Sequence, residues 1–87
     1  MSYRVTITEA ARKELRDMRG AILKRVTKKL LSLGEDPRPP GCLKLKGNEG
    51  DMWRVRVGDH RDVYTLEDVL RIVDIRKIGH RGDIYDR

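Results

Sequence analysis

The sequence predicts an α+β domain, a compact β-α-α-β-β-β arrangement in which two N-terminal helices pack on a mainly antiparallel, four-stranded sheet. Two observations predict this fold. Apolar residues recur at helical spacing from residue 9 to residue 33, whereas apolar and polar residues alternate in the segments before and after. The length of 87 residues is that of a single domain, residues 1–87, with one modest hydrophobic core.

Residues 3–8 are predicted to form the first strand, because apolar and polar side chains alternate there with a period of two. Thr8 is suited to cap the helix that follows, and Glu9 places an acid in its first turn, where the helix dipole favours one. The apolar stripe of this helix consists of Ala11, Leu15 and Met18. Gly20 then interrupts the pattern, and a second helical stripe follows.

The second helix carries apolar residues on one face and basic residues on the remainder. Its apolar positions are Ile22, Val26, Leu30 and Leu33, widened by Leu23 and Leu31. Its basic positions are Lys24, Arg25, Lys28 and Lys29, which we interpret as a solvated face. Gly34 stands where a helix C-terminal glycine belongs, and the proline-rich segment 36–41 predicts a loop.

The C-terminal half is predicted to form strands joined by turns. A short alternating stretch around Leu43 precedes a turn at residues 47–51. Two further strands, residues 52–57 and 60–66, are joined by a tight turn at Gly58-Asp59. A last strand over residues 69–78 carries apolar residues on both faces, which is typical of a central strand.

Individual side chains in these strands are assigned by alternation. We place Leu70, Ile72 and Ile78 on one face of the last strand and Val69, Val73 and Ile75 on the other. In the strand 60–66 the alternation fails, because Asp62 shares a face with Tyr64 and Leu66. Trp53 and Tyr64 are expected in the core, and Asp62 and Asp74 are expected to pair with nearby arginines.

The chain is basic, with 20 Lys and Arg residues against 14 Asp and Glu residues and a formal net charge of +6. Arginine outnumbers lysine 13 to 7, and its planar fork suits phosphate recognition. The charge therefore favours a polyanionic partner such as nucleic acid, although a soluble domain that is merely basic would show the same balance.

Several classes of protein are excluded. The length is too short for a multidomain enzyme, a Rossmann cofactor domain or a barrel hydrolase. No apolar run approaches the ~18 residues that span a bilayer, and no signal core is present, so we expect no membrane association. The single Cys42 excludes an internal disulfide and fits a reducing, cytoplasmic location. Two histidines and one cysteine lack metal-ligand spacing, so neither a metal nor another cofactor is expected.

A set of basic and titratable side chains is expected to meet on the sheet. Arg54 and Arg56 project from one side of a strand because they are two residues apart, and Arg61 follows just past the turn. The remaining members follow the last strand: His80, Arg81 and Tyr85. Such a set suits RNA cleavage, which needs a base for the 2′-hydroxyl, charge stabilisation at the phosphate and an acid for the leaving 5′-oxygen.

At these residues the chain resembles the RelE/ParE superfamily of bacterial toxins, and within it the RelE-like mRNA interferases. The resembling stretches are residues 44–47, 53–64 and 79–85, with the first strand, the two helices and the proline-rich loop in matching order. The resemblance implies a microbial-RNase-like fold and a metal-independent endoribonuclease that cuts mRNA in the ribosomal A site. In that reaction the 2′-hydroxyl attacks the adjacent phosphate and leaves a 2′,3′-cyclic phosphate. The resemblance also implies a cognate antitoxin that wraps the toxin in a hetero-oligomer.

The resemblance assigns a role to each residue that matches the pattern of the family. The strand positions held by Arg54 and Arg56 usually carry basic residues, one of them a lysine that acts as general base. Arg61 would hold phosphate, Arg81 would stabilise the transition state, and Tyr85 would stack on a base or share in proton transfer. Lys44 and Lys46 are further candidates for phosphate binding.

The two arginines depart from the lysine pattern, and the departure matters for the chemistry. Arginine has a pKa above ~12, so Arg54 and Arg56 can bind phosphate but are poor general bases. His80 or Tyr85 would then take the base role, or the chain would be a slow nuclease that depends on positioning. Two other functions stay open. One is a ParE-like inhibitor of DNA gyrase without RNase activity, and the other is an inactive relative that acts only through its antitoxin.

Overall fold

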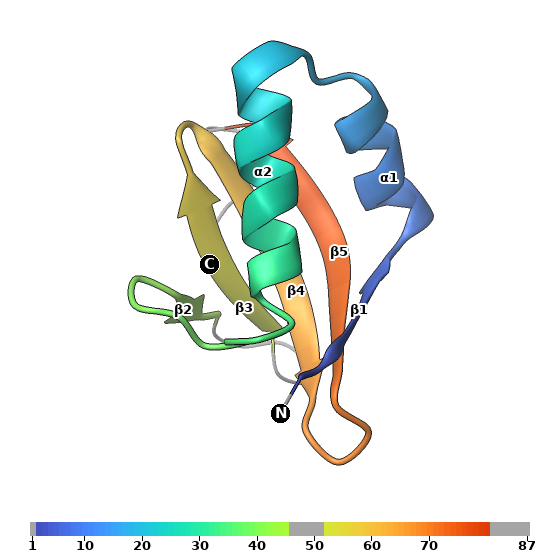
Figure 1. Cartoon of the computed structure of the whole chain (residues 1–87), viewed down its shortest axis with the longest axis vertical. Helices are drawn as coiled ribbons and strands as arrows, with labels where there is room; N and C mark the ends of the chain where they lie inside the picture. Colours follow the sequence, from blue (N-terminus) through green and yellow to red (C-terminus); the bar gives the residue numbers. More distant parts are fainter. Residues whose placement is uncertain (1, 46–51, 81–87) are drawn as a thin grey trace.

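The computed structural model describes residues 2–45 and 52–80, which form two helices on one face of a mixed five-stranded sheet (Figure 1). The elements are β1 (Arg4–Ile7), α1 (Glu9–Arg16), α2 (Gly20–Ser32), β2 (Leu43–Lys44), β3 (Met52–Val57), β4 (His60–Glu67) and β5 (Ile72–His80). The strand order is β1-β5-β4-β3-β2, in which β1 pairs parallel with β5 and the other pairs are antiparallel. The predicted α+β class and the mainly antiparallel sheet are therefore confirmed.

The predicted sheet had one strand too few. Leu43 and Lys44 form the short strand β2 and pair with Arg54 and Trp53 of β3. The sequence showed the alternation around Leu43, but two residues of pairing are too short to separate from a turn by pattern alone. Beyond Arg54, no strand of the described ranges pairs with this side of β3, so the last residues of β3 lie at the edge of the sheet.

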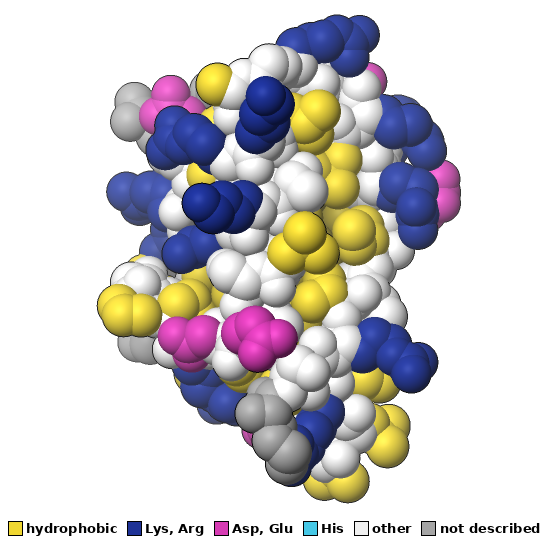
Figure 2. All heavy atoms as spheres, viewed as in Figure 1, with side chains coloured by type: hydrophobic (Ala, Val, Ile, Leu, Met, Phe, Trp, Pro, Cys, Tyr) yellow, Lys and Arg dark blue, Asp and Glu magenta, His cyan; other side chains and the backbone are white. Residues whose placement is uncertain are grey.

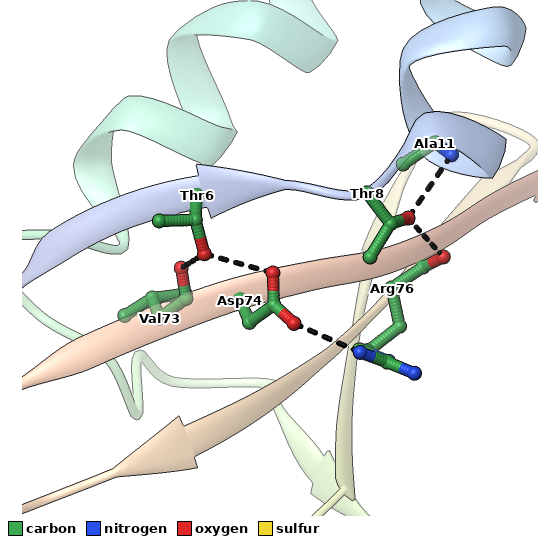
Figure 3. A network of polar contacts seen from close by, with 6 residues as sticks. All are labelled: Thr6, Thr8, Ala11, Val73, Asp74 and Arg76. Atoms are coloured by element: carbon green, nitrogen blue, oxygen red, sulfur yellow. Dashed lines mark hydrogen bonds and ion pairs between the residues drawn. The ribbon is translucent and has the colours of Figure 1, made fainter.

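The junction between β1 and α1 follows the prediction (Figure 3). Thr8 caps α1: its Oγ1 accepts a hydrogen bond from the backbone N–H of Ala11 at 3.3 Å and donates one to the carbonyl of Arg76 at 2.8 Å. On β1, Thr6 donates a hydrogen bond to Asp74 Oδ1 at 2.8 Å, and Asp74 forms an ion pair with Arg76 at 2.9 Å. The expected arginine partner of Asp74 is thus confirmed, and polar groups tie β1 and α1 to β5.

Gly34 has a different role from the one predicted. It follows the end of α2, but its backbone is not in the left-handed conformation of a C-terminal cap glycine. A Cβ atom at Gly34 would lie 3.0 Å from the carbonyl oxygen of Tyr3 and 3.2 Å from Cγ2 of Val5. The N–H of Tyr3 donates to the Gly34 carbonyl at 2.6 Å. Glycine is needed here because β1 passes close to the end of the helix.

The last strand begins later than predicted and contains an irregularity. β5 starts at Ile72, and Val69 and Leu70 lie exposed in the turn before it. On β4, Tyr64 pairs with Ile75 and Val63 pairs with Lys77, so Arg76 has no partner residue on β4. Such a bulge reverses the alternation of side chains beyond it. Ile78 therefore joins Val73 and Ile75 on the buried face, and its predicted place on the opposite face is wrong.

The core lies between the helices and the sheet. It is built mainly from aliphatic residues of α1, α2, β3, β4 and β5, with Tyr64 fully buried at its centre. The Tyr64 hydroxyl donates to the Pro37 carbonyl at 2.7 Å, which anchors the proline-rich loop. Trp53 packs against the core from β3, as predicted. β5 lies between β1 and β4, which confirms it as an interior strand. Within the described ranges, neither helix is long and apolar enough to cross a membrane.

Candidate functional site

Three of the predicted site residues meet on the side of the sheet that faces away from the helices. The two-residue turn at Gly58-Asp59 sets the register of β3 and β4, so that Arg56 lies directly across from Arg61 and Arg54 lies across from Val63. Directly opposed side chains project from the same face, and residues two apart on a strand do so too. We call this cluster of Arg54, Arg56 and Arg61 the arginine face.

The three arginines differ in their exposure to solvent. Arg54 is 5% exposed, Arg61 is half-buried and Arg56 is exposed. Electrostatic attraction between a guanidinium and an anion grows as water is removed from around the pair. The arginine face is therefore graded, from a buried cation at Arg54 to an open one at Arg56. Guanidiniums grouped in this way can hold a phosphodiester from several sides but cannot act as a general base near neutral pH.

Lys44 lies on the other side of the sheet from the arginine face. It pairs with Trp53, which packs against the core on the helix side, and its ammonium nitrogen lies 5.9 Å from the centre of the Trp53 ring. The guanidinium of Arg38 lies over the same ring at 5.1 Å. The structure thus does not bring Lys44 together with Arg54 and Arg56. Lys46 lies outside the described residues.

The backbone of β5 ends beside the arginine face. His80 pairs with His60 at the start of β4, and Gly79 pairs with Arg61. The chain therefore leaves the sheet at the end where Arg56 and Arg61 lie. The side chain of His80 and the whole of residues Arg81 and Tyr85 lie outside what the structure describes, and their catalytic roles stay predictions.

Asp62 is the most unusual titratable residue on the helix side. It is fully buried, and neither of its carboxylate oxygens has a hydrogen-bond partner. Burial raises the pKa of this carboxyl to about 7, against a smaller lowering by the positive charge of Lys29. The prediction that Asp62 pairs with an arginine is wrong, because within residues 2–45 and 52–80 it forms no ion pair and the cation that acts on it from α2 is a lysine. The broken alternation around Asp62 was the only sign of it in the sequence.

A groove between α2 and β3 is lined by four cations. The alternation within single strands could not predict that these residues meet. They are Arg25, Lys28 and Lys29 of α2 and Arg56 of β3. From the sequence alone, the basic residues of α2 were expected to form a solvated face. The available sign was that no Asp or Glu occurs between Gly20 and Gly34.

In residues 2–45 and 52–80, no group of three His, Cys, Asp or Glu side chains gathers in a way that could hold a metal ion.

Comparison with known proteins gives consistent relatives across almost the whole chain. Residues 5–85 match the family described as the ParE toxin of the type II toxin–antitoxin system parDE. A protein of Methanocaldococcus jannaschii named as a candidate toxin, RelE1, is 32% identical over 88 residues, covering 98% of this chain and 97% of the relative.

Solved structures show the same fold. The archaeal RelE–RelB complex of Pyrococcus horikoshii matches with a TM-score of 0.83 and 30% identity, covering 97% of this chain and 100% of the other. The toxin–antitoxin complex RelBE2 of Mycobacterium tuberculosis gives 0.80 and 26%, covering 93% and 100%. The isolated RelE toxin of Escherichia coli gives 0.78 and 25%, covering 95% and 88%.

Proposed function

The chain belongs to the RelE/ParE superfamily as a toxin of a type II toxin–antitoxin system, and from this premise we propose that it is an endoribonuclease that cuts mRNA in the ribosomal A site. The observation that carries the proposal is the arginine face, where Arg54, Arg56 and Arg61 converge from two neighbouring strands. Inhibition of a protein target would not require guanidiniums grouped at phosphate-binding spacing.

The arginine face would hold the scissile phosphate. Arg56 and Arg61 lie directly across from each other, so they can contact its non-bridging oxygens from both sides. The nearly buried Arg54 would add a cation whose attraction is little weakened by water. As the 2′-hydroxyl attacks the phosphorus, negative charge builds on these oxygens, and fixed guanidiniums stabilise it more than they stabilise the bound substrate.

Proton transfer would fall to residues beyond the arginine face. None of the three arginines can accept a proton near neutral pH. His80 and Tyr85 are the candidates for the base that deprotonates the 2′-hydroxyl, and Arg81 would stabilise the transition state or serve the leaving 5′-oxygen. The backbone pairing of Gly79 with Arg61 supports this assignment, because it brings the end of β5 to the arginine face. No metal ion is required for this reaction scheme.

The proposed partners are the ribosome, its mRNA and a cognate antitoxin. The complexes of related RelE proteins with RelB support the last of these. The toxin and its antitoxin would form a hetero-oligomer. The match to the ParE family favours one second candidate, inhibition of DNA gyrase without RNA cleavage.

Primer extension on translating mRNA after induction of the chain tests the proposal. We expect cuts in phase with codons, and a loss of cleavage of about 10²-fold or more for Arg61→Ala, comparable to the loss of one charge-stabilising donor in other enzymes. Arg12→Ala is the matched control, because it removes an exposed arginine of α1 that pairs with Glu9. Intact mRNA accompanied by DNA breaks would contradict the proposal and support gyrase inhibition.

His80→Ala and Tyr85→Phe then identify the base. If either one acts as the base, its variant lowers single-turnover cleavage and changes the pH profile, because the titrating group is lost. Wild-type rates in both variants would exclude these two residues. A slow reaction that depends on positioning alone would then remain.

A further inference from the structure

The groove between α2 and the edge of β3 adjoins the arginine face and shares Arg56 with it. Its volume is about 410 Å³. Its basic lining consists of Arg25, Lys28 and Lys29 from α2 and Arg56 from β3, and its other lining residues are Ser32, Val57 and Gly58. Figure 2 shows Lys and Arg side chains gathered over α2 and toward this edge of the sheet. We call it the α2 groove.

The sequence and the strand pairing together create the α2 groove. Arg25, Lys28, Lys29 and Ser32 are three and four residues apart, so they form one face of the helix. β2 pairs with Trp53 and Arg54 only, and the residues of β3 after Arg54 lie at the sheet edge within the described part of the chain. The basic face of α2 therefore lies beside exposed strand edge instead of beside another strand.

The cations of the α2 groove keep their charge available. Arg25, Lys28 and Arg56 form no ion pair with any acid in the ranges that the structure describes, including Asp59 in the adjacent turn. The arginines of α1 differ, because Arg12 and Arg16 both pair with Glu9, at 3.9 Å and 3.6 Å. The charge of Lys29 acts on the buried Asp62, whose pKa it lowers slightly against the effect of burial.

One of the guanidiniums lies beside the turn between β3 and β4. A Cβ atom on Gly58 would lie 3.7 Å from Nη1 of Arg25 and 3.5 Å from Cδ1 of Ile22. Gly58 has a φ of 59°, the left-handed conformation that glycine adopts without strain. Arg25 thus lies against the backbone of the turn.

The lining favours phosphate over a peptide as the occupant. An amphipathic peptide binds through apolar anchors that fill pockets. Among the described residues, the lining holds one aliphatic side chain, Val57, which is 6% exposed. Folded RNA is recognised largely by contacts to its phosphates and 2′-hydroxyls, for which separate cations along a groove suffice. Arg56 belongs to both sites, so RNA in the α2 groove would lie next to the strand held by the arginine face.

We propose that the α2 groove binds the phosphate backbone of a folded RNA segment that is not itself cut, and so docks the chain on a structured RNA such as that of the ribosome. The choice of the ribosome as the source of this RNA rests on the proposed function. The groove itself is assigned to RNA by its cations, its lack of apolar anchors and its position beside Arg56.

The test compares two double variants that remove equal charge. Arg25→Ala/Lys28→Ala alters the α2 groove without touching the arginine face, and Arg12→Ala/Arg16→Ala removes two cations that are paired with Glu9. Binding to purified ribosomes and to a short RNA duplex is measured across a range of salt concentrations. Thermal unfolding of both variants shows whether they fold.

We expect the groove variant to bind ribosomes and duplex about tenfold or more weakly, and to lower the salt slope of log K by about 2, roughly one per phosphate contact. The control variant should bind as wild type. At saturating ribosome concentration the groove variant should cut mRNA at the wild-type rate, because it lacks only docking contacts. Arg61→Ala should show the opposite pattern, with binding retained and cleavage lost.

These outcomes separate the groove from the proposed function. If the chain cuts no mRNA but the groove variant still loses affinity for both RNAs, the endoribonuclease proposal fails and the groove proposal stands. Equal losses in the two double variants, or wild-type binding by the groove variant, would overturn the groove proposal. The groove proposal would also fail if the groove variant bound RNA as wild type but bound polyglutamate more weakly. The α2 groove would then be a site for an acidic peptide.

Discussion

Two regions of the molecule differ in whether their polar and charged groups have partners. Along β1 and β5, polar groups find partners: Thr6 binds Asp74, Asp74 binds Arg76 and Thr8 binds the Arg76 carbonyl. Around α2 and β3, Arg25, Lys28 and Arg56 form no ion pair with an acid in the described ranges, and the carboxylate of Asp62 on β4 is buried without a hydrogen bond. The first region stabilises the fold. In our proposal, the second keeps positive charge available for an anionic ligand.

The largest effect on stability is expected at Asp62. Its pKa is about 7 in the folded chain and 3.8 in a free side chain, so the folded state binds its proton more tightly than the unfolded state. Below about pH 4 the carboxyl is protonated in both states, so its ionisation costs no stability. The cost grows as pH rises from about 4 to about 7 and levels off at about 4 kcal/mol above that range.

Asp62→Asn removes this cost, because the amide cannot ionise. At about pH 8 the variant should be more stable than wild type by roughly 2 kcal/mol, since a buried amide without partners still carries a penalty of its own. The advantage should disappear at about pH 5.5, and at about pH 4, where the wild-type carboxyl is protonated, the variant should be less stable by roughly 2 kcal/mol. Urea unfolding across this range measures both effects. Asp74→Asn is the control from the region with paired charges, and it should gain no stability at high pH because it loses the ion pair with Arg76. A wild-type stability that does not fall with pH would contradict the argument.

The sequence could predict the arginine face because the face depends on short-range rules. Alternation puts Arg54 and Arg56 on one side of β3, and a two-residue turn fixes Arg61 opposite Arg56. Ile78 was predicted on the wrong face because the bulge at Arg76 reverses the alternation. No local sequence pattern indicates this bulge. The position of Lys44 could not be predicted for a related reason. Its face relative to Arg54 depends on the register between β2 and β3, which the sequence did not supply.

The α2 groove and the role of Gly34 depend on contacts between distant segments. The groove exists because α2 lies along a strand edge that β2 leaves unpaired, and periodicity describes each element but not how they meet. Gly34 looked like a cap glycine because it follows the helix. Its proximity to Tyr3 and Val5 appears only once β1 is in place. In both cases the residue types were visible and the tertiary neighbours were not.

Gly34→Ala is expected to give the next largest effect, in the region where the polar groups are paired. Where the backbone can accommodate it, alanine for glycine stabilises by about 0.4–1 kcal/mol through the unfolded state. Here the added Cβ would lie 3.0 Å from the Tyr3 carbonyl oxygen and 3.2 Å from Val5 Cγ2, so we expect destabilisation by about 1–3 kcal/mol. Urea unfolding gives the sign directly. A double variant with Val5→Ala should lose less than the sum of the single changes, and a stabilising Gly34→Ala would disprove the close contact.

The smallest of these effects is expected for Thr8→Ala. The Thr8 hydroxyl both caps α1 and donates to the Arg76 carbonyl, so its loss leaves the N–H of Ala11 and that carbonyl to water. Loss of such a cap costs about 1 kcal/mol, and Thr8→Ser should restore most of it because the hydroxyl is kept. Thr27→Ala on the exposed surface of α2 is the matched control and should change stability by less than about 0.5 kcal/mol. RNA binding should be the same in all three variants, because Thr8 lies in the region whose polar groups are already paired. A loss of RNA affinity in Thr8→Ala alone would mean that the two regions are coupled.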